Sequence, residues 1–232
     1  DITYSLGASY YDQKGIIGGN TTDAGFKRLT TRLNTEFVLF KNDERSLVTV
    51  GENFTYSQTE NRSVATGNIY WNDLHNGLVQ HPLMPAYWEN SPDQYGFTPT
   101  MDGISNNSHN PLAVMYYRHN YSNLGNKGNT IVGNVYMEIE PLKNLKFRSS
   151  YGINAWFGTG RSWTPTYALG TLYQNATDGV NQSQYLGNNS TWTNTVSYES
   201  NIGDHNFTAL IGNEVYKNEI NFEVGGSMAN SL

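Results

Sequence analysis

The chain has 232 residues and a formal net charge of −6, and 15% of its residues are charged whereas 13% are aromatic. Its 14 Lys and Arg form no basic cluster in the sequence, which argues against a nucleic-acid partner, and the lack of Cys excludes disulfides and thiolate metal sites in this chain. No run of about 18 apolar residues occurs, so a transmembrane helix is excluded, whereas transmembrane strands are compatible with the mean hydropathy of −0.58.

Three strands are predicted in the N-terminal part of the chain, because apolar and polar side chains alternate there with a period of two. They span residues 2–11, 26–40 and 47–57. The apolar side chains that share a face in the second and third strands are Leu29, Leu33, Phe37, Leu39, Val48, Val50, Phe54 and Tyr56. A polar turn joins these two strands, so they are predicted to form a hairpin.

Four more strands are predicted after a long stretch without alternation. They span residues 130–139, 145–157, 191–199 and 206–216, and the residues from 217 onward are expected to begin another loop. The stretch from about 58 to 128 is rich in Asn, Pro, Tyr and Trp and is much longer than the usual loop of a compact domain. We expect it to be functional, folded on itself, or both.

The connections between the predicted strands alternate between short and long. Short turns lie at 41–44, 140–144 and 201–205, and long loops lie at 12–25, 58–128 and 158–190. Bacterial outer-membrane barrels have this asymmetry, with short periplasmic turns and long extracellular loops. We therefore predict an all-β chain of about seven antiparallel transmembrane strands with long extracellular loops.

Charged residues in the predicted strands lie mostly opposite the apolar side chains. Placing Arg or Lys at the middle of the lipid layer costs about 2 to 4 kcal/mol, so these charges are expected to face the barrel lumen. The predicted lumen-lining residues are Arg28, Arg32, Glu36, Glu138, Lys146 and Arg148, and Glu199 and Glu214 share their parity. Lys27 and Glu52 are exceptions; Lys27 is near a strand end, and Glu52 would need a bulge to reach the lumen.

Alternation by itself also fits a soluble protein. The main alternative is a secreted carbohydrate-binding β-sandwich or glycosidase domain, since a pair of catalytic carboxylates leaves no sequence signature. A surface barrel without transport, such as an adhesin, is a third hypothesis. The loop asymmetry favours a barrel, and burial of Leu29, Phe37, Phe147 and Ile153 against a second layer would contradict it.

Five sequence blocks carry a resemblance to a known family. They are Tyr10–Ile17 (YYDQKGII), Gly25–Asn34 (GFKRLTTRLN), Asn110–Ala113 (NPLA), Gly133–Asn154 (GNVYMEIEPLKNLKFRSSYGIN) and Thr191–Glu214 (TWTNTVSYESNIGDHNFTALIGNE). In type and order these blocks resemble the SusC/RagA family of TonB-dependent transporters of the Bacteroidetes. The resemblance spans nearly the whole chain.

The resemblance implies a 22-stranded antiparallel transmembrane β-barrel with an N-terminal plug, in which residues 1–232 form part of one barrel domain. It further implies TonB-powered uptake of glycans or oligopeptides across the Gram-negative outer membrane, together with a SusD-like surface lipoprotein that closes over the barrel mouth. The plug, the part that contacts the TonB complex and the remaining strands are expected to lie outside this chain. The implied partners are these parts, the lipoprotein, outer-membrane lipid and an oligosaccharide or peptide substrate.

Aromatic side chains in the long loops are candidate contacts for a substrate or a partner protein, because aromatic rings stack on sugars and anchor interfaces. The selected residues are Trp71, Trp88, Trp163, Tyr87 and Tyr167. Packing within the loops, or an aromatic girdle at the membrane surface, is the simpler explanation for any one ring.

No catalytic residue, metal site or cofactor is predicted. The five His are scattered without the spacing of a metal site, and the loop Asp residues lack the alternating acidic spacing of a calcium loop. The sequence contains no Gly-x-Ser-x-Gly motif and no phosphate loop. We therefore expect that the chain is not an enzyme.

Overall fold

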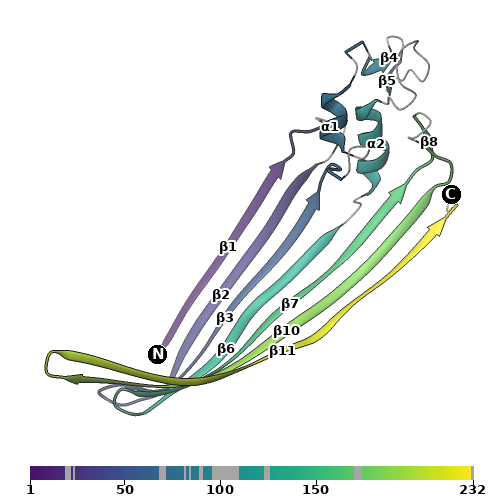
Figure 1. The fold of residues 1–232 in the computed structure, drawn as a ribbon. Coiled ribbons are helices and arrows are strands. Elements are labelled where there is room, and N and C mark those ends of the chain that lie inside the picture. Colours follow the sequence, from purple (N-terminus) through teal and green to yellow (C-terminus); the bar gives the residue numbers. More distant parts are fainter. Residues whose placement is uncertain are drawn as a thin grey trace.

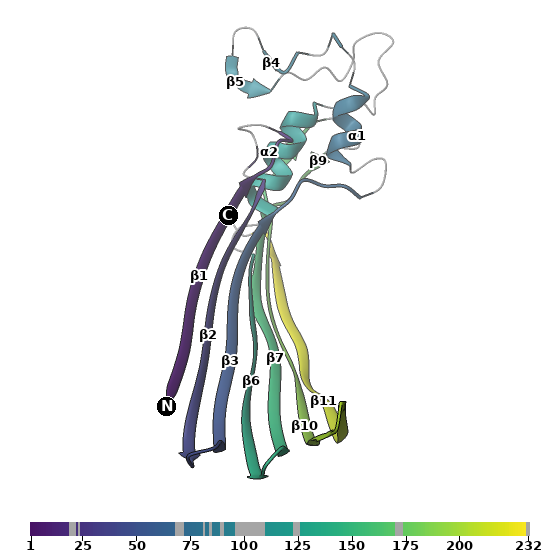
Figure 2. The same cartoon turned by 90° about the vertical axis from the view of Figure 1, so that its left-hand side faces the viewer.

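The computed structural model contains one large antiparallel sheet, with loops and short helices gathered at one end of it (Figures 1 and 2). The residues that the structure describes are 1–18, 22, 24–67, 72–80, 82–83, 85–88, 91–95, 110–122, 126–169 and 174–230. The strands of the large sheet are β1 (Ile2–Lys14), β2 (Gly25–Lys41), β3 (Ser46–Arg62), β6 (Lys127–Leu142), β7 (Leu145–Thr164), β10 (Gly179–Ile202) and β11 (His205–Ala229). Their spatial order follows the chain, so the sheet is an antiparallel meander.

The long connections hold the remaining elements. These are α1 (Asp73–Leu78), β4 (Tyr87–Trp88), β5 (Ser91–Tyr95), α2 (Pro111–Ser122), β8 (Tyr167–Ala168) and β9 (Gln174–Asn175). They lie at the end of the sheet opposite the three short turns, so the predicted alternation of short and long connections is present (Figures 1 and 2). Neither described helix is long and apolar enough to cross a membrane.

The register assigns the side chains of the sheet to two faces, because residues paired directly across strands point to the same side. Glu36, Gly51, Tyr136, Ser150 and Thr193 form one such row and belong to what we call the polar face. The opposite face, which we call the apolar face, carries Leu6, Leu29, Leu33, Phe37, Val50, Phe54, Ile131, Val135, Phe147, Ile153, Phe157, Val196, Ile211 and Val215.

The apolar face is not covered by a second layer within the described part of the chain. Leu29, Phe37 and Phe147 are 39%, 38% and 37% exposed, and Ile153 is half-buried between its neighbours. Among the described elements outside the sheet, α2 makes the main contact with it, at the loop end of β7. The burial that a sandwich would require is therefore not found in these residues.

The sheet is open. Its first and last strands, β1 and β11, have no partner strand on their outer edges among the described residues. Each outer edge therefore presents a row of backbone groups that could pair with another strand.

The strands extend further than the alternation predicts. β3 continues through Arg62, β7 through Thr164 and β11 through Ala229, and β10 begins at Gly179, within the predicted loop 158–190. In these extensions both faces carry polar residues, for example Gln182 and Gln184 on the apolar side of β10. Backbone pairing therefore continues where the side-chain pattern that predicts a strand has ended.

Candidate functional site

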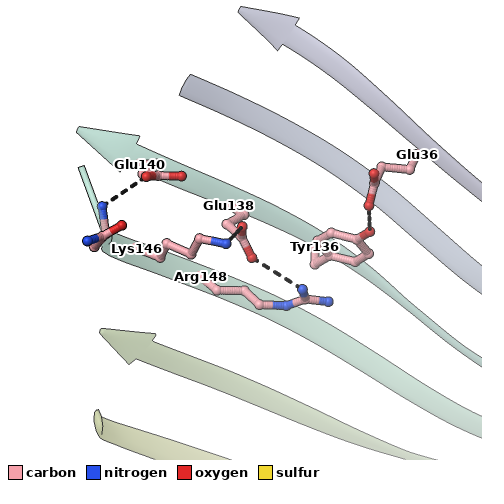
Figure 3. Close-up of polar contacts among 7 residues, drawn as sticks. Glu36, Tyr136, Glu138, Glu140, Lys146 and Arg148 are labelled. Carbon is pink, nitrogen blue, oxygen red and sulfur yellow. Dashed lines mark hydrogen bonds and ion pairs between the residues drawn. The ribbon is translucent and has the colours of Figure 1, made fainter. Parts of the chain in front are cut away.

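Charged side chains near the turn end of the polar face form one connected cluster (Figure 3). The Tyr136 hydroxyl donates a hydrogen bond of 2.8 Å to Glu36 Oε2, and the Arg148 guanidinium lies 3.7 Å from the centroid of the Tyr136 ring. Arg148 Nη1 and Lys146 Nζ lie 3.4 and 3.5 Å from the two carboxylate oxygens of Glu138. We call these five residues the polar-face cluster; it joins β2, β6 and β7 across the sheet.

Four members of the polar-face cluster were predicted to line the lumen, whereas Tyr136 was not selected. Tyr136 reaches Glu36 across β3 because the residue directly opposite it on β3 is Gly51, where any Cβ would collide with the Tyr136 ring. The sequence gives no sign of this contact, since it depends on pairing between strands far apart in the chain.

Rings that lie over glycines recur on the polar face. The three pairs, each directly opposite in the register, are Tyr136 over Gly51, Trp156 over Gly187 and Tyr185 over Gly158. A ring that covers a glycine shields the backbone and lets neighbouring strands curve toward the side on which the ring lies. The glycines of this face therefore make room for large side chains.

The remaining predicted lumen residues, Arg28 and Arg32, lie on the polar face nearer the long loops. The register places Arg28 between Tyr11 and Thr59 in one row, and Arg32 four residues farther toward the turns. All six predicted residues thus share one face.

The polar face is hollowed at its loop end. A hollow of 790 Å³ there is lined from five strands, mainly by glycines, hydroxyls and amides. The polar-face side chains around it are Thr59, Asn61, Ser162, Asn181, Ser183, Tyr185, Glu223 and Ser227. We call it the loop-end hollow; its amides and hydroxyls can both donate and accept hydrogen bonds, and Glu223 adds a carboxylate.

A second hollow of 450 Å³ lies lower on the same face. It is rich in asparagine, and Asn53 Nδ2 donates to Asn134 Oδ1 across β3 and β6 at 3.1 Å. Together with the loop-end hollow it extends the hydrogen-bonding part of the polar face toward the polar-face cluster.

The long loops pack around α2. Asn110 is the N-cap of α2, since its Oδ1 accepts from the Leu112 N–H, and its Nδ2 donates to the Ala86 carbonyl oxygen at 2.9 Å. Ala113 and Val114 are fully buried beside Leu169. These contacts join the connection between β3 and β6 to the connection between β7 and β10.

The aromatic residues predicted to contact a substrate or partner lie in different surroundings. Tyr167 stacks on Tyr117 with ring centroids 5.5 Å apart and packs on the buried residues of α2. Tyr87 is 42% exposed, and Trp163 is half-buried on β7. Trp71 and the side chain of Trp88 lie outside the described residues. Of the five rings, the structure therefore describes the surroundings of Tyr87, Trp163 and Tyr167 only, and their contact with a substrate or partner stays a prediction.

Three charged side chains lie among the apolar rows of the apolar face. Glu52 faces the apolar side between Thr35 and Val135, and no register shift occurs at that position of β3. Lys217 and Glu219 lie beside a bulge between β10 and β11, where Glu219 accepts a hydrogen bond of 2.7 Å from Ser190. Within the described part of the chain, no three His, Asp or Glu residues are grouped so that they could hold a metal ion.

Comparison with known proteins identifies the fold. No family model and no curated protein matches the sequence. Among solved structures, 98% of the chain superposes on a chain of the RagAB peptide transporter with a TM-score of 0.70 and 20% identity. The "closed-closed" and "open-open" states of the RagAB peptide importer give TM-scores of 0.68 at 19% and 18% identity, each again over 98% of this chain.

The match covers 24% of the first two chains and 27% of the third, so this chain spans about a quarter of their length. At these identities the likeness shows the fold. The sheet has the fold of part of a barrel transporter chain, which confirms the fold class and the resemblance predicted from the sequence.

Proposed function

We propose that this chain forms about seven neighbouring strands of the wall of a 22-stranded outer-membrane importer that is powered through TonB. In this proposal the apolar face contacts lipid, the polar face lines the lumen, and the long loops face the outside of the cell. The observation that carries it is an uncovered apolar face backed by a charged and hollowed polar face on a single-layered sheet.

The height of the apolar face agrees with this placement. On β7 the apolar rows run from Phe147 to Phe157, which is about 33 Å along the strand at roughly 3.3 Å per residue. With a strand tilt of about 40°, this corresponds to roughly 25 Å, the height of the apolar band of outer-membrane barrels. Aromatic rings occur at both ends of these rows, as expected for interfacial girdles.

We further propose that the substrate is an oligopeptide and that it contacts the loop-end hollow. In the proposed placement the hollow would lie on the lumen side, above the apolar rows and beside the loops, where an entering substrate would first meet the barrel wall. Its mixture of donors and acceptors suits peptide backbones, and the ionic polar-face cluster below suits charged termini and side chains. The similar solved structures are those of a peptide transporter and a peptide importer, which favours peptides over the glycans that the sequence resemblance also allows.

The open edges of β1 and β11 require further strands in a membrane, because lipid offers no hydrogen bonds to backbone groups. We propose that the rest of the barrel, with a plug and a region that contacts the TonB complex, supplies these strands and the energy coupling. A SusD-like lipoprotein would close the mouth above the loops around α2.

Introduced cysteines test the placement of the two faces, since the chain has no native Cys. In outer membranes, the Arg32→Cys variant should react with a membrane-impermeant maleimide once the mouth is open. The Leu33→Cys variant, one residue away on β2, should resist that reagent and respond to a lipid-soluble one. Equal aqueous labelling at both positions, or recovery of the protein in the soluble fraction, would contradict the proposal.

Uptake measurements test the substrate. A strain that lacks the gene should lose uptake of labelled oligopeptides while retaining uptake of labelled oligosaccharides, and a protonophore should abolish the peptide uptake of the parent strain. Loss of oligosaccharide uptake instead would assign the importer to glycans. Unchanged uptake of both classes would favour a surface barrel without transport.

A further inference from the structure

Five basic side chains gather at the loop end of the apolar face. These residues, which we call the outer cationic belt, are Lys14, Lys27, Arg62, Lys127 and Arg161. They come from β1, β2, β3, β6 and β7, so neighbouring members lie on neighbouring strands about 4.8 Å apart. Four of them are exposed, and Arg62 is half-buried.

The belt lies directly above the apolar rows. Leu29, Asn129 and Phe157 lie in one row of the apolar face, and Lys27 and Lys127 lie in the next row toward the long loops. Lys14, Arg62 and Arg161 lie one row farther in the same direction. This is the level at which lipid headgroups would lie if lipid chains covered the apolar face. The inference therefore rests on the membrane placement proposed above.

Positive charge exceeds negative charge at this level. The acidic side chains in these two rows of the apolar face are Asp12 and Glu60, so five cations face two carboxylates although the chain as a whole carries a net charge of −6. Glu60 pairs with Arg62 at 3.3 Å. The local charge is thus opposite in sign to that of the whole chain.

A hollow of 430 Å³ lies within the belt. It is bordered by Lys14, Lys27 and Arg62, by Asp12 and Glu60, and by the connection between β1 and β2. Three cations around one recess can contact a single multivalent anion, which separate exposed lysines cannot do. The recess, together with the charge excess, distinguishes the belt from an ordinary solvated rim.

We infer that the outer cationic belt binds the phosphate groups of an anionic lipid in the leaflet on the long-loop side of the membrane. The acyl chains of this lipid would cover the apolar rows below the belt. The phosphates of the lipid would lie at the recess and along the strands toward Arg161. Basic clusters at the membrane surface attract anionic lipids by such contacts. The bound lipid would fix the depth of the barrel and hold the bases of the long loops.

The test uses the complete protein purified in neutral detergent. It is titrated with diphosphoryl lipid A and, separately, with the same lipid after enzymatic removal of both phosphates. Native mass spectrometry counts the bound lipid molecules. We expect about tenfold tighter binding of the phosphorylated lipid. The triple variant Lys14→Gln, Lys27→Gln, Arg62→Gln should lose most of that difference. Its affinity for the dephosphorylated lipid should not change.

Two further variants control for net charge and for folding. Lys41→Gln, Arg45→Gln, Lys143→Gln removes three cations at the short turns and should bind both lipids as the parent does. Lys14→Arg, Lys27→Arg, Arg62→Lys keeps the charges and should keep the preference even if the glutamine variant does not fold. Equal binding of the two lipids by the parent protein, or an equal loss in the short-turn variant, would overturn the inference.

The outcomes separate this inference from the proposed function. If the membrane placement is wrong, the protein will be soluble without detergent and bind neither lipid. If only the belt is misassigned, the protein will fractionate with outer membranes and bind both lipids with the same affinity.

Discussion

Gly51→Ala should disrupt the polar-face cluster, although it adds a single methyl group. A Cβ at position 51 would collide with the end of the Tyr136 ring, which can move only by leaving its place over the strand. Tyr136 would then lose its hydrogen bond of 2.8 Å to Glu36 and its contact with the Arg148 guanidinium. The substitution therefore tests whether the ring over the glycine stabilises the sheet.

The expected cost follows from these two contacts. A hydrogen bond to a carboxylate contributes about 1.5 to 3 kcal/mol when buried, and about 1 kcal/mol is reasonable here because Glu36 is exposed. The cation–π contact adds about 0.5 to 1 kcal/mol. Replacing Gly by Ala within a strand returns about 0.5 kcal/mol, so the net loss should be about 1 to 1.5 kcal/mol.

A double-mutant cycle isolates the effect. In the Tyr136→Ala background the same Gly51→Ala substitution should be neutral or slightly stabilising, which gives a coupling energy of about 1.5 to 2 kcal/mol. Gly7→Ala is the matched control, because Gly7 lies on the polar face of β1 and an added Cβ there meets nothing within 4 Å. Urea unfolding of the complete barrel in lipid vesicles, followed by tryptophan fluorescence, measures the four proteins of the cycle and the control.

The reasoning would be refuted if Gly51→Ala and Gly7→Ala changed the free energy of unfolding by the same amount. It would also fail if Gly51→Ala cost as much without Tyr136 as with it, since the cost would then come from the backbone and not from the ring.

Three other substitutions test separate features. Glu138→Gln should cost up to about 1 kcal/mol, because it removes the shared partner of Lys146 and Arg148, and the loss should shrink at high salt in the same unfolding assay. Glu52→Leu should stabilise the barrel in vesicles by about 1 kcal/mol, since it removes a carboxylate from the apolar face; destabilisation would mean that Glu52 contacts another protein. Asn110→Ala should remove the cap of α2 at a local cost of about 1 to 2 kcal/mol. Amide hydrogen exchange in that helix should become faster, and unchanged exchange there would contradict the capping role.

The part of the sheet that has one apolar and one polar face could be predicted, because a two-faced sheet requires a strict alternation of side chains. On β2, Leu29, Leu33 and Phe37 alternate with Arg28 and Arg32. The register confirms that the apolar side chains and the arginines lie on opposite faces of the sheet. The seven strands, their order and the positions of the three short turns all follow from this alternation.

The contacts across strands could not be predicted. Tyr136 and Glu36 are 100 residues apart, and their hydrogen bond depends on β3 supplying a glycine between them. The outer cationic belt is equally scattered in sequence, from Lys14 to Arg161, so the chain lacks any basic run although its structure has a basic surface. Both features can be recognised only when the register of the strands is known.

The upper part of the sheet connects these features to the proposed transport. β7 continues from Phe157 to Thr164, roughly 23 Å along the strand at about 3.3 Å per residue, and β10 and β11 accompany it. In the proposed membrane placement, the outer side of the sheet above the cationic belt would meet neither lipid chains nor a protein core, so polar side chains would be tolerated on both faces. The loop-end hollow lies on the inner side of this raised wall, and α2 packs against the connection that follows β7. In the proposed function, a wall that rises beyond the lipid would place substrate contact at the loop-end hollow above the membrane, and the polar-face cluster would lie within the membrane.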